Sequence, residues 1–400
     1  MKKNLVSLMM IATILLSASY AMQDLRAESD AETTSAELSP KDTFPTSLHA
    51  QGPSNGRENV YEAGPGLLTK LPFRDSPCQN CHAETYADGT PVDEATYKPS
   101  CKDCHATKGD EVPQERCFGC HESGFDRYSV HREAGLECMD CHTLNDVHGN
   151  GRIQETMYAP DAIEADCADC HDDLLDDAVK SHEIHLDTVD CGACHLETAE
   201  TCYSCHLESY LEGDHQDRVL TKHENFIMLV NNKEGMVHAA TYQTIPWKGK
   251  TFVGILPIFN HTIMDAKNTR DCGDCHNNDA VREYKEEGRI WVARWDEDSK
   301  SLWLRKGVIP VPPDWRYRLK FDQVTYTGNP DDPVPGYPSE DPESWTYVGN
   351  VPDVAQDFKD YVDPLTSEQM LELMKDYSEY ESTGQGTCDD RHLTCQTVSD

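Results

Sequence analysis

The sequence predicts a mostly irregular chain with short α-helices whose core is made of bound cofactors, followed by a smaller β-containing part. Two observations carry this prediction. A five-residue unit, Cys-x-x-Cys-His, occurs eight times. The stretch 78–206, which holds seven copies, has 28 Asp and Glu but only 19 Ile, Leu, Val, Phe, Met and Trp. So few apolar side chains cannot offset a backbone entropy cost of roughly 1–2 kcal/mol per residue.

The eight motifs share a His directly after the second Cys. They are Cys78/Cys81/His82, Cys101/Cys104/His105, Cys117/Cys120/His121, Cys138/Cys141/His142, Cys167/Cys170/His171, Cys191/Cys194/His195, Cys202/Cys205/His206 and Cys272/Cys275/His276. This spacing is typical of covalent haem c attachment, in which two thiols bond the porphyrin and the His ligates iron. A Cys-x-x-Cys pair alone is also compatible with a redox disulfide or half a zinc site. Eight copies, each followed by His, favour eight covalently bound haem c groups.

The haems themselves would supply the apolar core that stretch 78–206 lacks. Seven macrocycles, held by thioethers and iron–His bonds, would also cross-link the chain as metals or disulfides staple small domains. Helices of one or two turns are expected around each motif. The short step from Cys191 to Cys202 predicts that the sixth and seventh haems are close neighbours.

With these motifs the chain resembles the octahaem c-type cytochromes, a superfamily of multihaem electron carriers and oxidoreductases. The resemblance rests on eight short motifs within residues 78–276. It implies a haem-cored multihaem cytochrome c fold. It leaves open which member of the superfamily is closest.

The N-terminus predicts export. Lys2 and Lys3 precede an apolar run from Leu5 to Leu16, and small residues end it before Met22. We interpret residues 1–21 as a secretory signal peptide and expect a periplasmic or extracellular protein without a membrane span. The formal net charge of −37 disfavours nucleic acid as a partner. It is compatible with simple solubility or with docking of cationic partners or metal ions.

Three further segments follow the signal peptide. Residues 22–60 are acidic and read as a mobile arm, 61–276 form the octahaem domain, and 277–400 form a haem-free Trp/Pro-rich domain. Within 207–271, the runs 226–230 and 251–256 are suited to strands or buried segments.

The C-terminal domain carries several local signals. Residues 291–295 and 301–304 predict a β-hairpin, and 365–381 a helix whose capping box is Thr366 and Gln369. Trp291, Trp295, Trp303, Trp315 and Trp345 are expected to form a small core. Cys388 and Cys395 are expected to form a disulfide, the default in an exported protein.

Ten His lie outside the motifs and are candidates for the second axial position of eight irons. Those placed within the haem-bearing stretches are the strongest candidates: His131, His148, His182, His185 and His261. His215 and His223 follow the seventh motif, while His238 and His49 have weaker contexts. Two His per iron would give six-coordinate, low-spin haem, and Met ligands have no usable spacing here.

Two functions remain open at this level. The first is conduction of electrons along closely spaced haems, with other redox proteins or an extracellular or metal acceptor as partners. The second, which the resemblance implies, is an oxidoreductase acting on small nitrogen or sulfur oxyanions or hydroxylamine. It would need one iron with an open sixth position. All eight motifs carry His and spare His are plentiful, which favours electron transfer.

His49 stands apart because it lies in the predicted arm. Such an arm could bring its His to the first haem of the same chain or to a terminal haem of a neighbouring subunit. The chain is similar to polymerising multihaem cytochromes in its loop-rich, haem-cored build, and exchanged ligands would generate a homopolymer. The simpler alternative is a monomer with a disordered arm.

Overall fold

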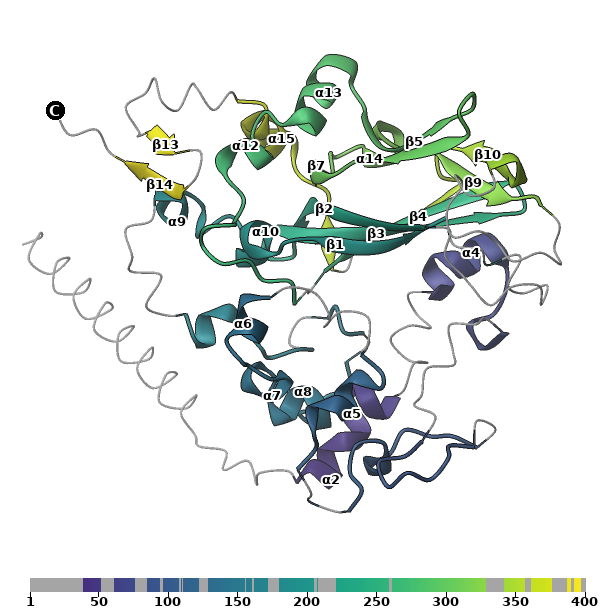
Figure 1. The fold of residues 1–400 in the computed structure, drawn as a ribbon, viewed down its shortest axis with the longest axis vertical. Coiled ribbons are helices and arrows are strands. Elements are labelled where there is room, and N and C mark those ends of the chain that lie inside the picture. Colours follow the sequence, from purple (N-terminus) through teal and green to yellow (C-terminus); the bar gives the residue numbers. More distant parts are fainter. Residues whose placement is uncertain are drawn as a thin grey trace, which may run out of the picture. The chain divides into compact units, whose positions relative to one another are not determined.

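The structure is a computed structural model (Figure 1). It describes residues 39–51, 61–75, 85–93, 96–107, 109, 111–121, 129–154, 156–159, 162–171, 180–204, 207, 221–258, 261–328, 342–356, 361–375, 387–389 and 392–396. The predicted signal peptide and most of the predicted arm therefore lie outside the described residues. The chain divides into two compact units, residues 1–42 and 43–400. In the first, the Ser39 hydroxyl donates to the Asp42 carboxylate at 2.5 Å.

Up to the sixth motif, the described chain is built from very short helices, as the sequence predicts. The α-helices are α2 (Pro40–Thr43), α4 (Pro65–Thr69), α5 (Gln114–Phe118), α6 (Val130–Glu133), α7 (Cys138–Cys141), α8 (Leu144–His148), α9 (Lys180–His185) and α10 (Cys191–His195). Four 3₁₀ turns complete this part: η1 (Phe44–Thr46), η2 (Phe73–Asp75), η4 (Cys101–Asp103) and η5 (Cys167–Asp169).

A seven-stranded sheet follows, and it is larger than the sequence predicts. Its strands are β1 (Ala199–Tyr203), β2 (Thr221–Asn232), β3 (Val237–Trp247), β4 (Lys250–Pro257), β7 (Gly307–Pro310), β11 (Val354–Gln356) and β12 (Val362–Asp363). β2, β3 and β4 form an antiparallel meander, while β7 and β11 add parallel to β2 and β4. Three of these strands come from the expected haem-free domain, so the sheet joins it to the segment before the last motif.

The C-terminal part adds smaller elements. These are α12 (Cys272–Cys275), α13 (Asp279–Glu287), β5 (Ile290–Asp296), β6 (Ser301–Leu304), α14 (Trp315–Arg318), β8 (Leu319–Phe321), β9 (Gln323–Tyr326), η7 (Pro342–Ser344), β10 (Trp345–Gly349), α15 (Ser367–Leu373), β13 (Thr387–Asp389) and β14 (His392–Gln396). β5 and β6 form the predicted hairpin, with Asp296 opposite Ser301. The helix α15 begins at the predicted capping box of Thr366 and Gln369 but ends at Leu373, earlier than predicted.

The apolar core lies between these sheets and helices. The largest fully buried side chains include Tyr242, Phe252 and Phe321. Of the five Trp predicted to form a core, Trp295, Trp315 and Trp345 are buried, Trp291 is half-buried and Trp303 is 49 % exposed. The prediction is wrong for Trp303 because side chains alternate in direction along β6: Leu302 is buried, and Trp303 points to the other side, where the Arg305 guanidinium lies 5.1 Å from its ring centroid.

Two further observations bear on the sequence predictions. Cys388 and Cys395 lie directly opposite one another in the antiparallel pair β13–β14, the backbone arrangement that the predicted disulfide requires. None of the helices that the structure describes has the length and apolar character of a membrane span.

Candidate haem-binding sites

Most described motifs are folded as a single helical turn. In η4, α7, η5 and α12 the amide of the motif His donates to the carbonyl of the first Cys, at 2.8–3.0 Å. This turn brings both thiols and the imidazole of one motif close to one another. The sequence Cys-x-x-Cys-His therefore acts as one rigid unit, with three chain groups available for a porphyrin and its iron.

The third motif differs in its place on the helix. The helix α5 ends at Phe118, so Cys117 lies inside it, whereas Cys120 and His121 follow its end. The turn is closed in the same way nevertheless, because the amides of Cys120 and His121 donate to the Cys117 carbonyl at 3.1 and 2.9 Å. This geometry is compatible with haem attachment through Cys117 and Cys120, which stays a prediction.

The motif Cys are predicted to bind haem as thioethers, and the structure holds them as thiols. No disulfide joins the motif Cys whose side chains the structure describes: Cys101, Cys104, Cys117, Cys120, Cys138, Cys141, Cys167, Cys170, Cys191, Cys194, Cys272 and Cys275. Several of them, Cys120 included, are exposed. In the second and fifth motifs both Cys residues are exposed, as attachment to the vinyl groups of a porphyrin requires.

A capping box fixes four of the motif turns. The residue before the first Cys and the Asp before the second Cys bond one another's amides: Ser100/Asp103, Glu137/Asp140, Asp166/Asp169 and Asp271/Asp274. These boxes satisfy orphan donors of the helix N-terminus. The pattern Cys-x-Asp-Cys-His is visible in the sequence, and it explains part of the acidic character of this region.

Six motif His each face a His from outside the motifs. The ring-centroid distances are 6.2 Å for His105–His148, 6.0 Å for His121–His49, 6.1 Å for His142–His261, 5.9 Å for His171–His131, 6.3 Å for His195–His182 and 6.2 Å for His276–His185. No two pairs share a residue. The partners lie 13 to 119 positions apart in sequence, from His182–His195 to His142–His261, so local chain geometry does not account for the regularity.

These separations fit an iron between the two rings. Two metal–nitrogen bonds of about 2 Å place the facing nitrogens about 4 Å apart, and half of each imidazole adds about 1 Å, giving about 6 Å between centroids. A direct N–H···N hydrogen bond would bring the centroids to about 5 Å. A porphyrin supplies four equatorial ligands, so two axial His complete the site. The residues present therefore fit haem with bis-His ligation.

The electrostatics of the facing His also suit metal ligation. Burial, and then the charge of the facing imidazole, lower the pKa of His131 and His185. The same two causes lower the pKa of His148. Neutral imidazole is the form that binds metal.

His49 reaches its partner because the segment after α2 is docked and not free. His49 Nδ1–H donates to the Val147 carbonyl at 3.2 Å, and Ser47 is 2 % exposed. Gly149 makes this approach possible: its φ is +77°, and a Cβ there would lie 2.7 Å from the Ser47 nitrogen. The sequence interpretation placed His49 at the first haem or a neighbouring subunit. In the structure it faces the third motif of its own chain, through His121.

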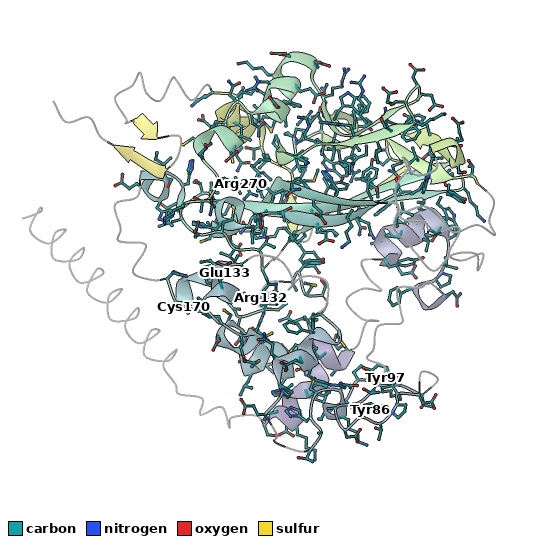
Figure 2. All side chains as sticks on the ribbon, viewed as in Figure 1. Tyr86, Tyr97, Arg132, Glu133, Cys170 and Arg270 are labelled. Atoms are coloured by element: carbon teal, nitrogen blue, oxygen red, sulfur yellow. The ribbon has the colours of Figure 1, made fainter. Side chains whose placement is uncertain are left out.

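The sixth and eighth motifs are tied together on both sides. On one side, a single helix, α9, carries both facing residues, His182 and His185. On the other side, Arg270 reaches from the loop before α12 to the end of α10 (Figure 2). Its guanidinium donates to the carbonyls of Cys194 at 3.3 Å, Glu197 at 2.7 Å and Leu196. The eighth motif, which is remote in sequence, is thereby placed beside the sixth.

The thiols show which motifs are neighbours. Burial and then the charges of Asp103, Cys117 and Cys120 raise the pKa of Cys104, linking the second and third motifs. Burial, followed by the charge of Cys117 and a hydrogen bond to it, raises the pKa of Cys138 to about 11, linking the third and fourth. In haem-bearing protein these sulfurs would be thioethers and would not titrate. The pKa shifts therefore show only which motifs lie close together.

The series continues through the remaining motifs. Burial, then Cys170, raises the pKa of Cys141, linking the fourth and fifth motifs. A hydrogen bond between Cys167 and Cys191 links the fifth and sixth. Burial raises the pKa of Cys194 to about 11, with Cys272 among the neighbouring charges, which links the sixth and eighth. The described motifs thus form one sequence of neighbours: second, third, fourth, fifth, sixth, eighth.

Two candidate ligands are engaged within the sheet. Burial lowers the pKa of His223 to about 4, so the ring is neutral. Its Nε2–H donates to the Arg305 carbonyl at 2.6 Å and its Nδ1 accepts from the Tyr242 hydroxyl at 2.5 Å. Both nitrogens are occupied, which differs from the expected ligand role, because the strand β2 extends beyond the predicted run 226–230 and includes His223. His238 is buried on β3, with Nδ1 3.3 Å from Asp190, the N-cap of α10.

Most residues of the first and seventh motifs lie outside the part of the chain that the structure describes. Cys78, Cys81, His82, Cys205, His206 and His215 are outside the described residues, and only the backbone of Cys202 is described, in β1. The expected proximity of the sixth and seventh haems is therefore a prediction still. Among the residues that the structure does describe, no three His, Cys, Asp or Glu gather as a metal site. The pairs, by contrast, provide the two axial ligands that haem needs.

Comparison with known proteins adds no relative: no family model, no curated protein and no solved structure matches the chain.

Proposed function

We propose that this protein is a multihaem c-type cytochrome that conducts electrons along a series of eight covalently bound haems. The single observation that carries the proposal is the order of six neighbouring motifs, the second to the sixth and the eighth, each with a facing His pair. Haem would supply iron that alternates between ferric and ferrous states. The chain's own residues would hold both axial positions of each iron and set the spacing of the motifs.

The pairing favours conduction over catalysis. A haem that binds a small substrate needs an open or weakly held sixth position. At six motifs a second imidazole faces the first instead, at a separation that suits two axial ligands. The remaining motifs, the first and seventh, are where an oxidoreductase would have its open iron. Turnover of nitrite and hydroxylamine by the wild-type protein is therefore the activity to assay against the proposal.

The order of motifs provides a sharp test. Replacing Cys138 and Cys141 by Ala removes the fourth haem and separates the second and third sites from the fifth, sixth and eighth. Replacing Cys101 and Cys104 removes the second haem, at one end of the described series, and serves as the matched control. Intact mass must first show seven haems in each variant. We expect conductance of a protein film to fall strongly in the first variant and little in the control.

Equal losses in the two variants would contradict a linear path. A wild-type protein that turns over nitrite or hydroxylamine at a stoichiometric high-spin haem would replace the proposal with the oxidoreductase. We further propose export to the periplasm or cell surface, and a redox protein or an extracellular or metal acceptor as partner. These follow from the N-terminal sequence and the haem motifs.

A further inference from the structure

Asp146 is a carboxylate with a buried side chain that lies directly behind a motif His. It lies in α8, four residues after His142, and its side chain is 6 % exposed. Its Oδ2 accepts the Nδ1–H of His142 at 3.0 Å. Because a carboxylate only accepts, Nδ1 carries the proton and Nε2 of His142 is left for the iron.

The carboxylate is held in this position from three sides. Oδ2 also accepts from the amide of Thr143 at 3.2 Å, and Oδ1 accepts from the amide of Glu164 at 2.6 Å. The Thr143 bond belongs to the capping box of α8. If the Asp146 side chain turned away, both amides would lose their acceptor. This cost holds the carboxylate in contact with His142.

We propose that Asp146 lowers the reduction potential of the fourth haem and places it below that of the eighth, an inference that rests on the proposed haem sites. A carboxylate behind the ligating ring strengthens imidazole as an electron donor. A stronger donor, together with a nearby negative charge, stabilises ferric over ferrous iron. Both effects act in the same direction and lower the potential.

His276 of the eighth motif shows the contrast. Its Nδ1–H donates to the Glu372 backbone carbonyl at 3.1 Å, so the hydrogen bond is to a neutral dipole, and the nearby charges of Glu372 and Lys375 act on the ring in opposite directions. The eighth haem should therefore titrate at a higher potential than the fourth. At partial reduction, electrons would occupy the eighth haem before the fourth.

The test is Asp146→Asn in the full-length holoprotein, with Glu164→Gln as the matched control. Glu164 is an exposed carboxylate beside the same helix, bonded to Thr143 and Asn145 and not to a motif His. Potentiometric titration followed by low-temperature EPR resolves the individual low-spin haems. His261→Ala, which removes the facing residue of His142, identifies the component that belongs to the fourth haem.

We expect Asp146→Asn to raise the potential of that component, while Glu164→Gln leaves it nearly in place. An unchanged potential in Asp146→Asn, or equal shifts in both variants, would overturn the inference. A wild-type protein that carries no covalently bound haem would instead overturn the proposed function. If Asp146→Asn does not assemble with eight haems, Asp146→Ser, which removes the charge and retains an acceptor, takes its place under the same criteria.

Discussion

Two regions of the chain reach order by different means. In the described residues between 85 and 192, no apolar side chain is buried, whereas β2, β3 and β4 enclose side chains such as Tyr242, Phe252 and Ile255. In the first region Leu144, Ile153 and Ile184 are 61 %, 68 % and 45 % exposed. Leu144 and Ile184 lie close in sequence to paired His, so haems at the proposed sites would cover them. One region folds around side chains, and we propose that the other folds around cofactors.

The largest effect should come from withholding haem. Without attachment, the described chain from 85 to 192 lacks an apolar core, and its helices are too short to persist alone. We expect amide hydrogen exchange there to lose its protection while β2, β3 and β4 retain theirs. Equal protection of residues 101–171 with and without haem would show that side chains alone hold this region in its fold.

A core substitution should affect only the sheet. Ile255 is 1 % exposed on β4, so Ile255→Ala should lower the free energy of unfolding of this region by about 2–5 kcal/mol. The haem absorption spectrum should stay unchanged. Leu144→Ala, at an exposed position of the other region, is the control, and denaturant titration measures both. A comparable loss in the control would remove the distinction between the regions.

Two classes of His provide the next comparison. His131→Ala should leave the fifth haem without its second axial ligand, creating one high-spin haem that binds carbon monoxide. His223→Ala should weaken the sheet, because the Arg305 carbonyl and Tyr242 hydroxyl lose their partner, and leave the spectrum low-spin. Resonance Raman spectra of the two variants separate the cases. A high-spin signal in His223→Ala would restore His223 as a ligand.

The smallest effect concerns Arg270, which stands between the two regions. Arg270→Gln removes a positive charge beside the sixth and eighth motifs, and should lower the reduction potentials of both haems. Arg270→Lys retains the charge and should keep the potentials closer to wild type, although it loses part of the carbonyl bonding. Redox titration checks this prediction. Identical potentials in all three proteins would leave Arg270 only a structural role.

The sequence was most informative where one residue type has one chemical use. The eight motifs, the capping box at Thr366 and the strands at 226–230 and 251–256 follow from local pattern. The roles of His49 and His223 do not, since they depend on contacts between residues 72 and 82 positions apart in sequence. The spacing of His142 and Asp146 was available as an i,i+4 pair, but only the helix α8 shows that the side chains meet.

The extent of the sheet could not be predicted for a related reason. β7, β11 and β12 are two to four residues long and gain their stability from pairing with β2 and β4. Such strands carry little periodicity of their own. The pairing of facing His is equally non-local, because most partners lie 40 or more positions apart in sequence.

The central claim is that the facing His pairs are pairs of axial ligands. Quantitative EPR of the ferric holoprotein tests it most directly, because spin integration counts low-spin haems per chain. The account predicts at least six low-spin haems, one for each described pair. Fewer than six low-spin haems per fully loaded chain would contradict it.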